Sequence, residues 1–228
     1  MYILRHMTPA PLTVEPDVLI PEAREILRSN RFRHLPVIDK DWRLVGMVTD
    51  RDIRSAYPSS VLSGEERRHE LEQVSKTPVS EIMSTDLVNL LPHSTIDDAL
   101  LLLEKKRVGA IPVLDEKGVI VGIFSMRDLI RAYKRIFGLA EKGSSLVTIK
   151  DDGEPNVLAR VVKILEQKGI PFTRLSRSKL TGDEKSPVIV YIRVQTYNIS
   201  AVHSVLLGAG FEFVDPEPLL PEDRHLNS

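Results

Sequence analysis

Two octets in the sequence place the same polar side chains at the same spacing. GMVTDRDI occupies residues 46–53, and GIFSMRDL occupies residues 122–129. Each octet has a hydroxyl residue after an apolar run, an Arg two positions later and an Asp directly after the Arg. An Arg in the first turn of a helix opposes the helix dipole unless an anion binds there. A short carboxylate beside it suits the hydroxyl groups of a ribose. The octets therefore indicate a nucleotide site.

The same octets also fit a purely structural role. In each octet the hydroxyl and the acid are three residues apart, which is the spacing of a capping box at the start of a helix. The two pairs are Thr49 with Asp52 and Ser125 with Asp128. Such a box needs no ligand and contributes about 1 kcal/mol. Against this role stand Gly46 and Gly122, since glycine weakens a strand unless something approaches its backbone closely. The sequence leaves both interpretations open.

The octets belong to a longer internal repeat. Residues 7–53 align with residues 83–129 without a gap, and thirteen positions are identical. A repeat of this length is one structural unit duplicated within the chain. Each copy predicts an extended segment, a helix, a hairpin and a second helix, because aliphatic residues at helical spacing precede two short apolar runs. One copy alone would bury little core, so we expect the two copies to pack as a pair.

The chain changes character after the second copy. Residues 145–214 predict the element order βαββαβ, with helices over NVLARVVKILEQKG and NISAVHSVLLGAG, a turn at TGDEKS and a last strand at FEFV. This order is typical of a ferredoxin-like fold. We therefore expect an α/β (α+β) chain in which the duplicated unit is followed by a ferredoxin-like βαββαβ domain.

The composition excludes several classes of function. The chain has 31 Lys and Arg against 32 Asp and Glu, and it has no cysteine. The balanced charge offers no basic surface for nucleic acid, and a thiol nucleophile or a cysteine zinc site is impossible. The histidines lack metal-ligand spacing, and the sequence has no phosphate-binding loop or hydrolase motif. No apolar run could cross a membrane. We therefore expect a cytoplasmic protein that is not an enzyme and has no metal or catalytic cofactor.

The repeated pattern resembles a known family. A Pro, a helix, LPVID or IPVLD, and the octet, repeated once over about residues 1–135, are similar to a tandem pair of CBS domains (a Bateman module). The resemblance implies that the two units pack through their sheets and leave two clefts for adenine nucleotides such as AMP, ADP or ATP, or for S-adenosylmethionine.

The resemblance also implies which residues would bind the ligand. The polar residues of the octets would contact phosphate and ribose, and the apolar segments before them would line the base. These residues are Thr49, Arg51, Asp52, Ser125, Arg127, Asp128, Leu35, Pro36, Val37, Ile111, Pro112 and Val113.

The two copies differ where the phosphate would lie. Arg33 and His34 precede LPV, whereas Gly109 and Ala110 precede IPV. Members of the family that bind phosphate tightly often carry basic residues at these positions. We therefore expect unequal clefts, in which Arg33, His34 and Arg51 form the better phosphate clamp. The alternative for His34 is a partly buried histidine that contacts no ligand.

The C-terminal segment resembles an ACT domain, a module that senses small molecules and forms dimers. The resemblance rests on DDGEPNVLARVVKILEQKGI, in which Asn156 replaces the Gly that is usual in the family. Two CBS domains followed by an ACT-like domain is the layout of the acetoin-utilisation accessory (AcuB-like) proteins. We expect residues 1–60 to be the first CBS unit, 61–77 a charged helical connector, 78–137 the second CBS unit, 145–215 the ACT-like domain and 216–228 a mobile tail.

These expectations combine into one function and one alternative. We expect a regulatory protein that senses an adenosine-containing ligand in the clefts of its CBS pair. Its ACT-like domain would relay the signal, form the dimer or bind a second small ligand. Its partners would be a second copy of the chain and a regulated enzyme, with neither nucleic acid nor a membrane. The alternative is a non-catalytic assembly subunit whose clefts are vestigial.

Overall fold

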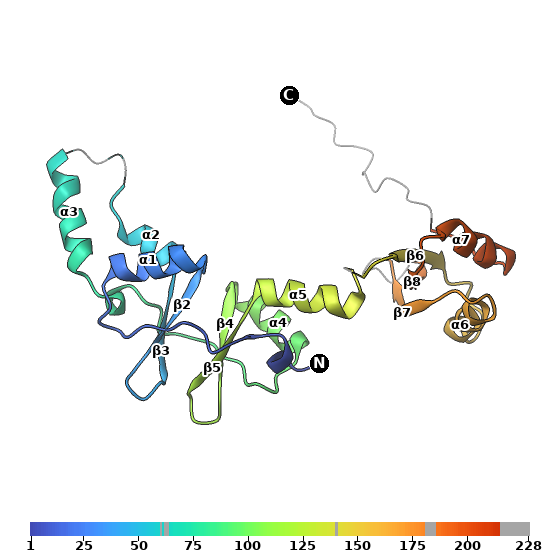
Figure 1. Cartoon of the computed structure of the whole chain (residues 1–228), viewed down its shortest axis with the longest axis horizontal. Helices are drawn as coiled ribbons and strands as arrows, with labels where there is room; N and C mark the ends of the chain where they lie inside the picture. Colours follow the sequence, from blue (N-terminus) through green and yellow to red (C-terminus); the bar gives the residue numbers. More distant parts are fainter. Residues whose placement is uncertain (60, 62–63, 140, 181–185, 215–228) are drawn as a thin grey trace. The chain divides into compact units, whose positions relative to one another are not determined.

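Each copy of the repeat folds into a helix, a β-hairpin and a second helix, as its pattern predicts (Figure 1). The structure is a computed structural model that describes residues 1–59, 61, 64–139, 141–180 and 186–214. The elements of the first copy are α1 (Ile20–Asn30), β2 (His34–Ile38), β3 (Leu44–Thr49) and α2 (Asp50–Ala56). Those of the second copy are α4 (Ile96–Lys106), β4 (Ala110–Leu114), β5 (Ile120–Ser125) and α5 (Met126–Phe137). The charged connector forms α3 (Gly64–Lys76), which buries none of its side chains.

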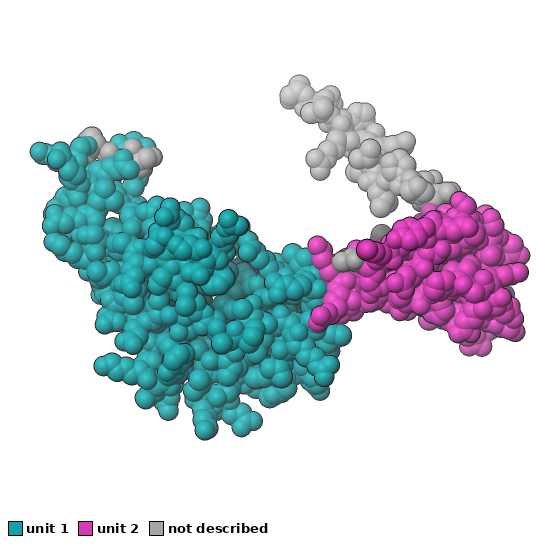
Figure 2. Space-filling model, in the orientation of Figure 1, with its two compact units in different colours: residues 1–132 teal, residues 133–228 magenta. Residues whose placement is uncertain are grey.

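The chain divides into two compact units, residues 1–132 and residues 133–228 (Figure 2). The first unit holds both copies of the repeat. In α1 the residues Ile20, Ala23 and Leu27 are buried, and α4 buries the residues at the three equivalent positions. Side chains three and four positions apart lie on one face of a helix, which is how the sequence pattern identified these helices.

Both hairpins turn in the same way. The carboxylate of Asp39 accepts hydrogen bonds from the backbone N–H groups of Asp41 and Arg43, both at 2.9 Å, and Asp115 makes the equivalent pair of bonds in the second copy. An aspartate that bonds to the backbone ahead of it stabilises a turn. This role explains why the aspartate is identical in the two copies. The strands of each hairpin pair antiparallel, as predicted.

The segment that leads into the first helix of each copy lies against the other copy. Near the N-terminus, which includes the short helix η1 (Ile3–Arg5), the backbone N–H of Ile3 donates to the carbonyl of Ser94 at 2.9 Å. Strand β1 (Thr8–Pro9) then pairs with β5. Before the second copy, in η2 (Val79–Glu81), the N–H of Val79 donates to the carbonyl of Val18 at 2.8 Å. The exchange joins the two copies, because separating them would break the backbone bonds of both segments.

A methionine from each exchanged segment packs on a strand glycine. A methyl group added to Gly122 would clash with the side chain of Met7, and one added to Gly46 would clash with the side chain of Met83. The strand glycines therefore make room for a side chain of the protein itself. The interpretation of these glycines as a sign of a closely bound ligand is wrong, because the methionines occupy that space.

The second unit forms a three-stranded antiparallel sheet with two helices. Its elements are β6 (Ser144–Lys150), α6 (Val157–Gln167), β7 (Phe172–Lys179), β8 (Val188–Gln195) and α7 (Ile199–Gly208), with strand order β6-β8-β7. This order and the βαββα succession confirm the ferredoxin-like class. The last predicted strand is reduced to an isolated bridge between Phe213 and Ile149, beside β6.

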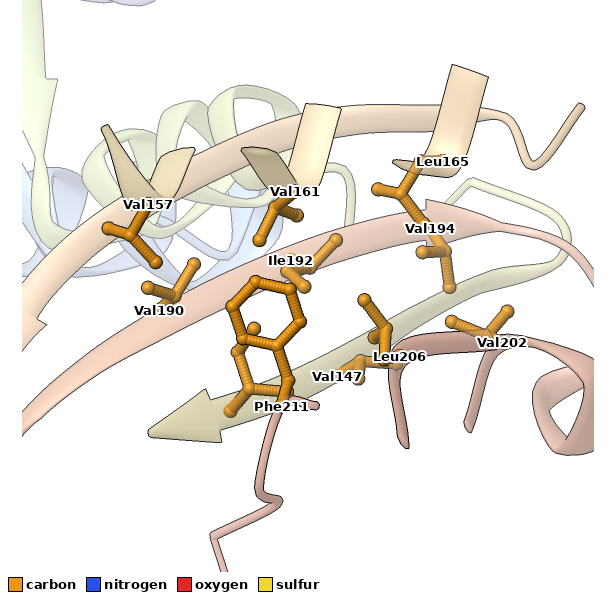
Figure 3. Close-up of a cluster of buried hydrophobic side chains, with 11 residues drawn as sticks. Val147, Val157, Val161, Leu165, Val190, Ile192, Val194, Val202, Leu206 and Phe211 are labelled. Carbon is orange, nitrogen blue, oxygen red and sulfur yellow. The ribbon is translucent and has the colours of Figure 1, made fainter. Parts of the chain in front are cut away.

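Aliphatic side chains from both helices and the sheet form the core of this unit (Figure 3). Val190, Ile192 and Val194 of β8 alternate along the strand and face the same side, where they meet side chains of α6 and α7. All three are fully buried or nearly so. The alternation is the one that the sequence VIVYIRVQ predicts for a sheet with one covered face.

An ion pair joins the loop before α6 to the helix itself. Arg160 donates to both carboxylate oxygens of Asp152, at 2.6 and 2.8 Å, and this bond lowers the pKa of that carboxyl. Asn156 has a φ of 59°, in the left-handed region that favours Gly and tolerates Asn. Asn156 therefore adopts this left-handed conformation at the start of α6 without a glycine.

Some predictions fall outside the described residues. The mobile tail, residues 216–228, and most of the turn at TGDEKS belong to this group. Within the described residues, none of the helices combines the length and the apolar character that crossing a membrane requires.

The contact between Met7 and Gly122 gives a first prediction. Gly122→Ala should lower the free energy of unfolding by about 1–3 kcal/mol, because the new methyl group overpacks the site. In a Met7→Ala background the same substitution should cost less, because the clash is gone. Urea denaturation of the four proteins in this double-mutant cycle measures the coupling. Strictly additive costs would contradict the packing described.

Candidate functional site

A cavity of about 1010 Å³ in the first unit is lined by both copies of the repeat. We name it the cleft. The first copy contributes residues between Asn30 and His34, together with Trp42, and the second contributes parts of β4, β5 and the start of α5. Residues of the entry segment between Thr8 and Thr13 complete the wall. Binding sites for small molecules commonly have volumes of about 300–1,000 Å³, so the cleft can hold a nucleotide.

The cleft brings together predicted site residues from different copies. Arg33 and His34 of the first copy line it with Ser125, Arg127 and Asp128 of the second octet. The clamp predicted from the sequence instead combines Arg33 and His34 with Arg51, and Arg51 is not among the lining residues. The two copies pack against each other, and a methyl group added to Gly109 would lie 3.0 Å from the His34 ring. The start of β2 therefore meets the second copy.

Both octets form the capping boxes that their spacing predicts. In the first octet the N–H of Thr49 donates to the carboxylate of Asp52 at 2.8 Å, and the N–H of Asp52 donates to the Thr49 hydroxyl at 3.3 Å. In the second octet the equivalent distances between Ser125 and Asp128 are 2.9 and 3.4 Å. Capping is thus a real role of both octets.

A third capping box shows that this role alone does not identify a site. Thr95 and Asp98 form the same pair of bonds, at 2.8 and 3.1 Å, at the start of α4. Asp98 is exposed, and neither residue lines the cleft. Thr95–Asp98 is therefore a matched reference for what a capping box does without a ligand.

Asp128 differs from the other capping acids in its burial. As a whole residue it is 2% exposed, less than any other charged residue that the structure describes. Its Oδ2 makes the capping bonds, whereas its Oδ1 has only long contacts, with the Thr8 hydroxyl at 3.4 Å and with Arg131 at 3.5 Å. Contacts of this length are weak, so Oδ1 can still accept strong hydrogen bonds from a ligand.

The charge of the cleft favours an anionic ligand. Four arginines line it, Arg31, Arg33, Arg127 and Arg131, against the single carboxylate of Asp128. Guanidinium groups bind phosphate through charge-assisted, often bidentate, hydrogen bonds. The excess of positive charge therefore suits a ligand with one or more phosphate groups.

His34 contributes no positive charge at neutral pH. Burial lowers its pKa below the ordinary value, the neighbouring Arg33 lowers it further, and Asp52 opposes these effects. A histidine with a lowered pKa is neutral at pH 7, so it can only donate or accept a neutral hydrogen bond. Within the phosphate clamp predicted from the sequence, the positive charge therefore comes from Arg33 and Arg51 and not from His34.

Trp42 gives the cleft an aromatic wall that the sequence analysis missed. It is the only tryptophan of the chain, it is 59% exposed, and it lines the cleft. Its φ of 62° is in the left-handed region, where the second copy has Gly118 with a φ of 80°. A bulky residue in this conformation costs about 1–2 kcal/mol, and such outliers concentrate at functional sites. The sequence did contain a signal for this residue, because Trp42 occupies a turn position at which the second copy has a glycine, Gly118.

The apolar residues predicted to line the base are part of the core. The side chains of Leu35, Val37, Ile111 and Val113 have no exposed surface. The carbonyls of Pro36 and Pro112 accept hydrogen bonds from the extended segments that precede each helix, at 3.1 and 3.0 Å. The residues just before them, at the starts of β2 and β4, reach the cleft instead.

The chain belongs to the CBS domain family, whose sequence profile matches residues 3–59 and 79–135. A CBS domain-containing protein of Dictyostelium discoideum is 35% identical over 124 residues, which are 54% of this chain and 85% of that protein. Inosine-5'-monophosphate dehydrogenase of Aquifex aeolicus is 30% identical over 125 residues, which are 54% of this chain and 23% of the enzyme. The match thus covers under a quarter of that enzyme.

Solved structures agree with a tandem CBS pair. CBSX2 of Arabidopsis thaliana in complex with AMP is 26% identical, with a TM-score of 0.50, and covers 59% of this chain and 97% of its own. The CBS pair of MJ0100 in complex with 5'-methylthioadenosine and S-adenosylmethionine is 25% identical, with a TM-score of 0.50, and covers 60% of this chain and 98% of its own. An acetoin utilisation protein (AcuB) from Vibrio cholerae, 24% identical with a TM-score of 0.52, covers 62% of this chain and 96% of its own and shares the fold.

The lowered pKa of His34 gives a second prediction. The unfolded chain has a His34 pKa of about 6.5 and binds a proton more readily than the folded protein as the pH falls through this value. The free energy of unfolding should therefore decrease from pH 7.5 to pH 5.5. His34→Ala, which installs the residue of the second copy, should weaken this decrease. Urea denaturation at the two pH values measures it, with His69→Ala on exposed α3 as control. An unchanged decrease in His34→Ala would contradict the assignment.

Proposed function

We propose that this protein is a regulatory protein that binds an adenosine-containing ligand in the cleft of its CBS pair. One observation carries the proposal. The cleft places a buried carboxylate, that of Asp128, whose Oδ1 has only long contacts, in the same cavity as several arginines and the exposed Trp42. These are groups that can bind the ribose, the phosphate and the base of a nucleotide.

The proposed contacts follow from the chemistry of each group. The Oδ1 atom of Asp128 would accept from the ribose hydroxyls, while Oδ2 keeps its capping bonds. Arg33, Arg127 and the Ser125 hydroxyl would bind the phosphate. Trp42 would cover one face of the adenine ring, since an aromatic side chain stacks on a base.

The first octet is a second candidate site. Thr49, Arg51 and Asp52 hold the positions equivalent to Ser125, Arg127 and Asp128, and Thr49 pairs with His34 at the start of β2. Gly109 and Ala110 occupy the positions equivalent to Arg33 and His34. They have no charged side chain, so the site at the first octet lacks a counterpart of Arg33. We therefore propose that the two sites are unequal and that the cleft is the stronger one.

Similar proteins support the adenosyl class of ligand. The structure of CBSX2 contains AMP, and that of the MJ0100 pair contains 5'-methylthioadenosine and S-adenosylmethionine. The positive charge of the cleft favours AMP, ADP or ATP over S-adenosylmethionine, whose sulfonium carries a positive charge. The small share of the dehydrogenase that matches is consistent with a CBS pair that regulates and does not catalyse.

We extend the proposal to the rest of the chain. Residues 1–60 and 78–137 would be the two CBS units, 61–77 their connector and 145–215 an ACT-like domain that relays the signal, dimerises or binds a second small ligand. A cytoplasmic homodimer that controls an enzyme partner fits this layout. Regulation requires the ligand to bind one arrangement of the protein more tightly than another.

A fluorescence titration tests the proposal directly, because Trp42 is the only tryptophan and lines the cleft. AMP, ATP and S-adenosylmethionine are added separately, and saturable quenching of Trp42 is expected for the nucleotides. Asp128→Ala should weaken AMP binding by about ten- to a hundredfold, because the ribose loses a charged hydrogen-bond acceptor.

Asp98→Ala is the matched control, since it removes the same capping acid from α4 outside the cleft. It should bind AMP as the wild type does. If no ligand changes the fluorescence or the melting temperature, the sensor proposal fails and the assembly subunit with vestigial clefts takes its place. If both Ala variants lose binding equally, the effect of Asp128 is on folding and not on the ligand.

A further inference from the structure

A second cavity, of about 350 Å³, lies between α1, α2 and the turn that follows α1. Arginine dominates its lining. The arginines are Arg24, Arg28, Arg31, Arg33 and Arg54, and the one acidic residue among the lining residues is Asp50. We name this cavity the arginine pocket. It has more positive charge than the cleft in about a third of the volume.

Acidic neighbours neutralise only part of this charge. Arg54 pairs with Asp50 at 2.9 Å, and Arg28 pairs with Glu25 at 3.0 Å. Arg31 and Arg33 have no ion pair with any of the residues that the structure describes.

Arg24 adds a third guanidinium group without an acidic partner. It lies over the ring of Tyr57, with its central carbon 4.4 Å from the ring centroid, and forms no ion pair within the described part of the chain. The cation–π contact holds its guanidinium group in place and leaves its charge in full. Three of the guanidinium groups that line the arginine pocket therefore form no ion pair with the residues that the structure describes.

The repeat provides an internal comparison for these arginines. The positions equivalent to Arg24, Arg28, Arg33 and Arg54, 76 residues later, are Leu100, Glu104, Gly109 and Ile130. The second copy forms the same helices and the same hairpin without them. The fold of a copy therefore does not require this group of arginines.

Compensation of the helix dipole explains only part of the group. Cations near the C-terminus of α1 are favourable, and Arg28 is in the last turn of that helix. In α4 the same need is met by Lys105 and Lys106. Arg54 is in the last turn of α2, so the dipole accounts for it as well, whereas Arg24 in the middle of α1 is not explained in this way. Like charges gathered in one cavity repel each other, so an anion bound there would stabilise them.

We propose that the arginine pocket binds a chain of phosphate groups. Guanidinium groups recognise phosphate oxygens in bidentate geometry, and arginine keeps its charge under all physiological conditions. The volume suits an oligophosphate and leaves no room for a complete nucleotide beside it. Phe32 and Asp50 also line the pocket, but Asp50 is already paired with Arg54, so arginine dominates its chemistry.

The chain of phosphates has two chemical sources, and the shared wall makes both feasible. Arg31, Phe32 and Arg33 line the arginine pocket and the cleft alike. A free oligophosphate could occupy the pocket alone. Alternatively, a nucleotide in the cleft could extend its phosphate tail past this wall, and this second source rests on the proposed function.

Calorimetric titration of the full chain with inorganic tripolyphosphate, AMP and ATP tests the proposal at constant ionic strength. The test variant is Arg24→Leu with Arg54→Ile, because the second copy carries these residues at the equivalent positions and still folds. The matched control is Arg67→Leu with Arg68→Ile, which removes the same charge from exposed α3. Trp42 fluorescence is recorded in parallel and reports occupancy of the cleft.

For the wild type we expect tripolyphosphate to bind without quenching Trp42, or ATP to bind more tightly than AMP. The test variant should lose about tenfold in whichever affinity is seen, and the control should lose little. AMP binding should be unchanged in both. Loss of tripolyphosphate binding in the test variant supports the pocket even if AMP never binds, which would be a failure of the proposed function alone.

Three results would overturn the proposal. The first is no binding of tripolyphosphate together with equal affinities for AMP and ATP. The second is tripolyphosphate that quenches Trp42 and competes with AMP, which would place the anion in the cleft. The third is an equal loss in the test and control variants, which would mean that only the overall charge matters. A melting curve of each free variant shows that it is folded before the titration.

Discussion

The exchange of entry segments between the two copies is the constraint on which the rest of the first unit depends. Each copy has a hairpin and two helices, but part of its buried core arrives on the segment that leads to the other copy. Val79 belongs to the core of the first copy, and Met7 packs on a strand glycine of the second. Neither copy can complete its core alone, so the two fold together and their mutual orientation is fixed.

That fixed orientation creates the cleft. Because the copies meet through the starts of β2 and β4, the arginine before one hairpin lies near the octet of the other copy. A single copy would present only part of this lining, because Arg33 and Trp42 come from the first copy and Arg127 and Asp128 from the second. The duplication therefore does more than double a site, since it assembles one site from two unlike halves.

The capping box and the ligand site use the same side chain without conflict. In Asp128 one carboxylate oxygen closes the helix start and the other is left for the cleft. The cap also holds the carboxylate in a fixed position, which lowers the entropy lost when a ligand binds. The two interpretations that the sequence left open are thus compatible, and Thr95–Asp98 shows the cap on its own.

Sequence reasoning predicted the elements of this protein better than it predicted the contacts between them. The repeat, both hairpins, the capping boxes and the ferredoxin-like order all follow from local patterns, because helical spacing, alternation and turn residues act over a few positions. The grouping of Arg33 with the second octet depends on the packing of one copy on the other, which no local pattern records. The role of Gly46 and Gly122 depends on methionines more than thirty residues away.

Aromatic and charged surfaces were missed for a related reason. Trp42 is in a predicted turn, and its contact with the cleft depends on where the hairpin of the first copy meets the second. The arginines of α1 read as an ordinary charged helix face until α2 and the following turn enclose them.

Hydrogen–deuterium exchange of the full chain with and without saturating AMP tests the central claim, that one ligand is held by both copies at once. The account predicts slower exchange of backbone amides in residues 30–34 and in residues 123–131 together, because both segments line the cleft. Slower exchange confined to the first octet, around residues 49–52, or no change in either segment, would contradict it.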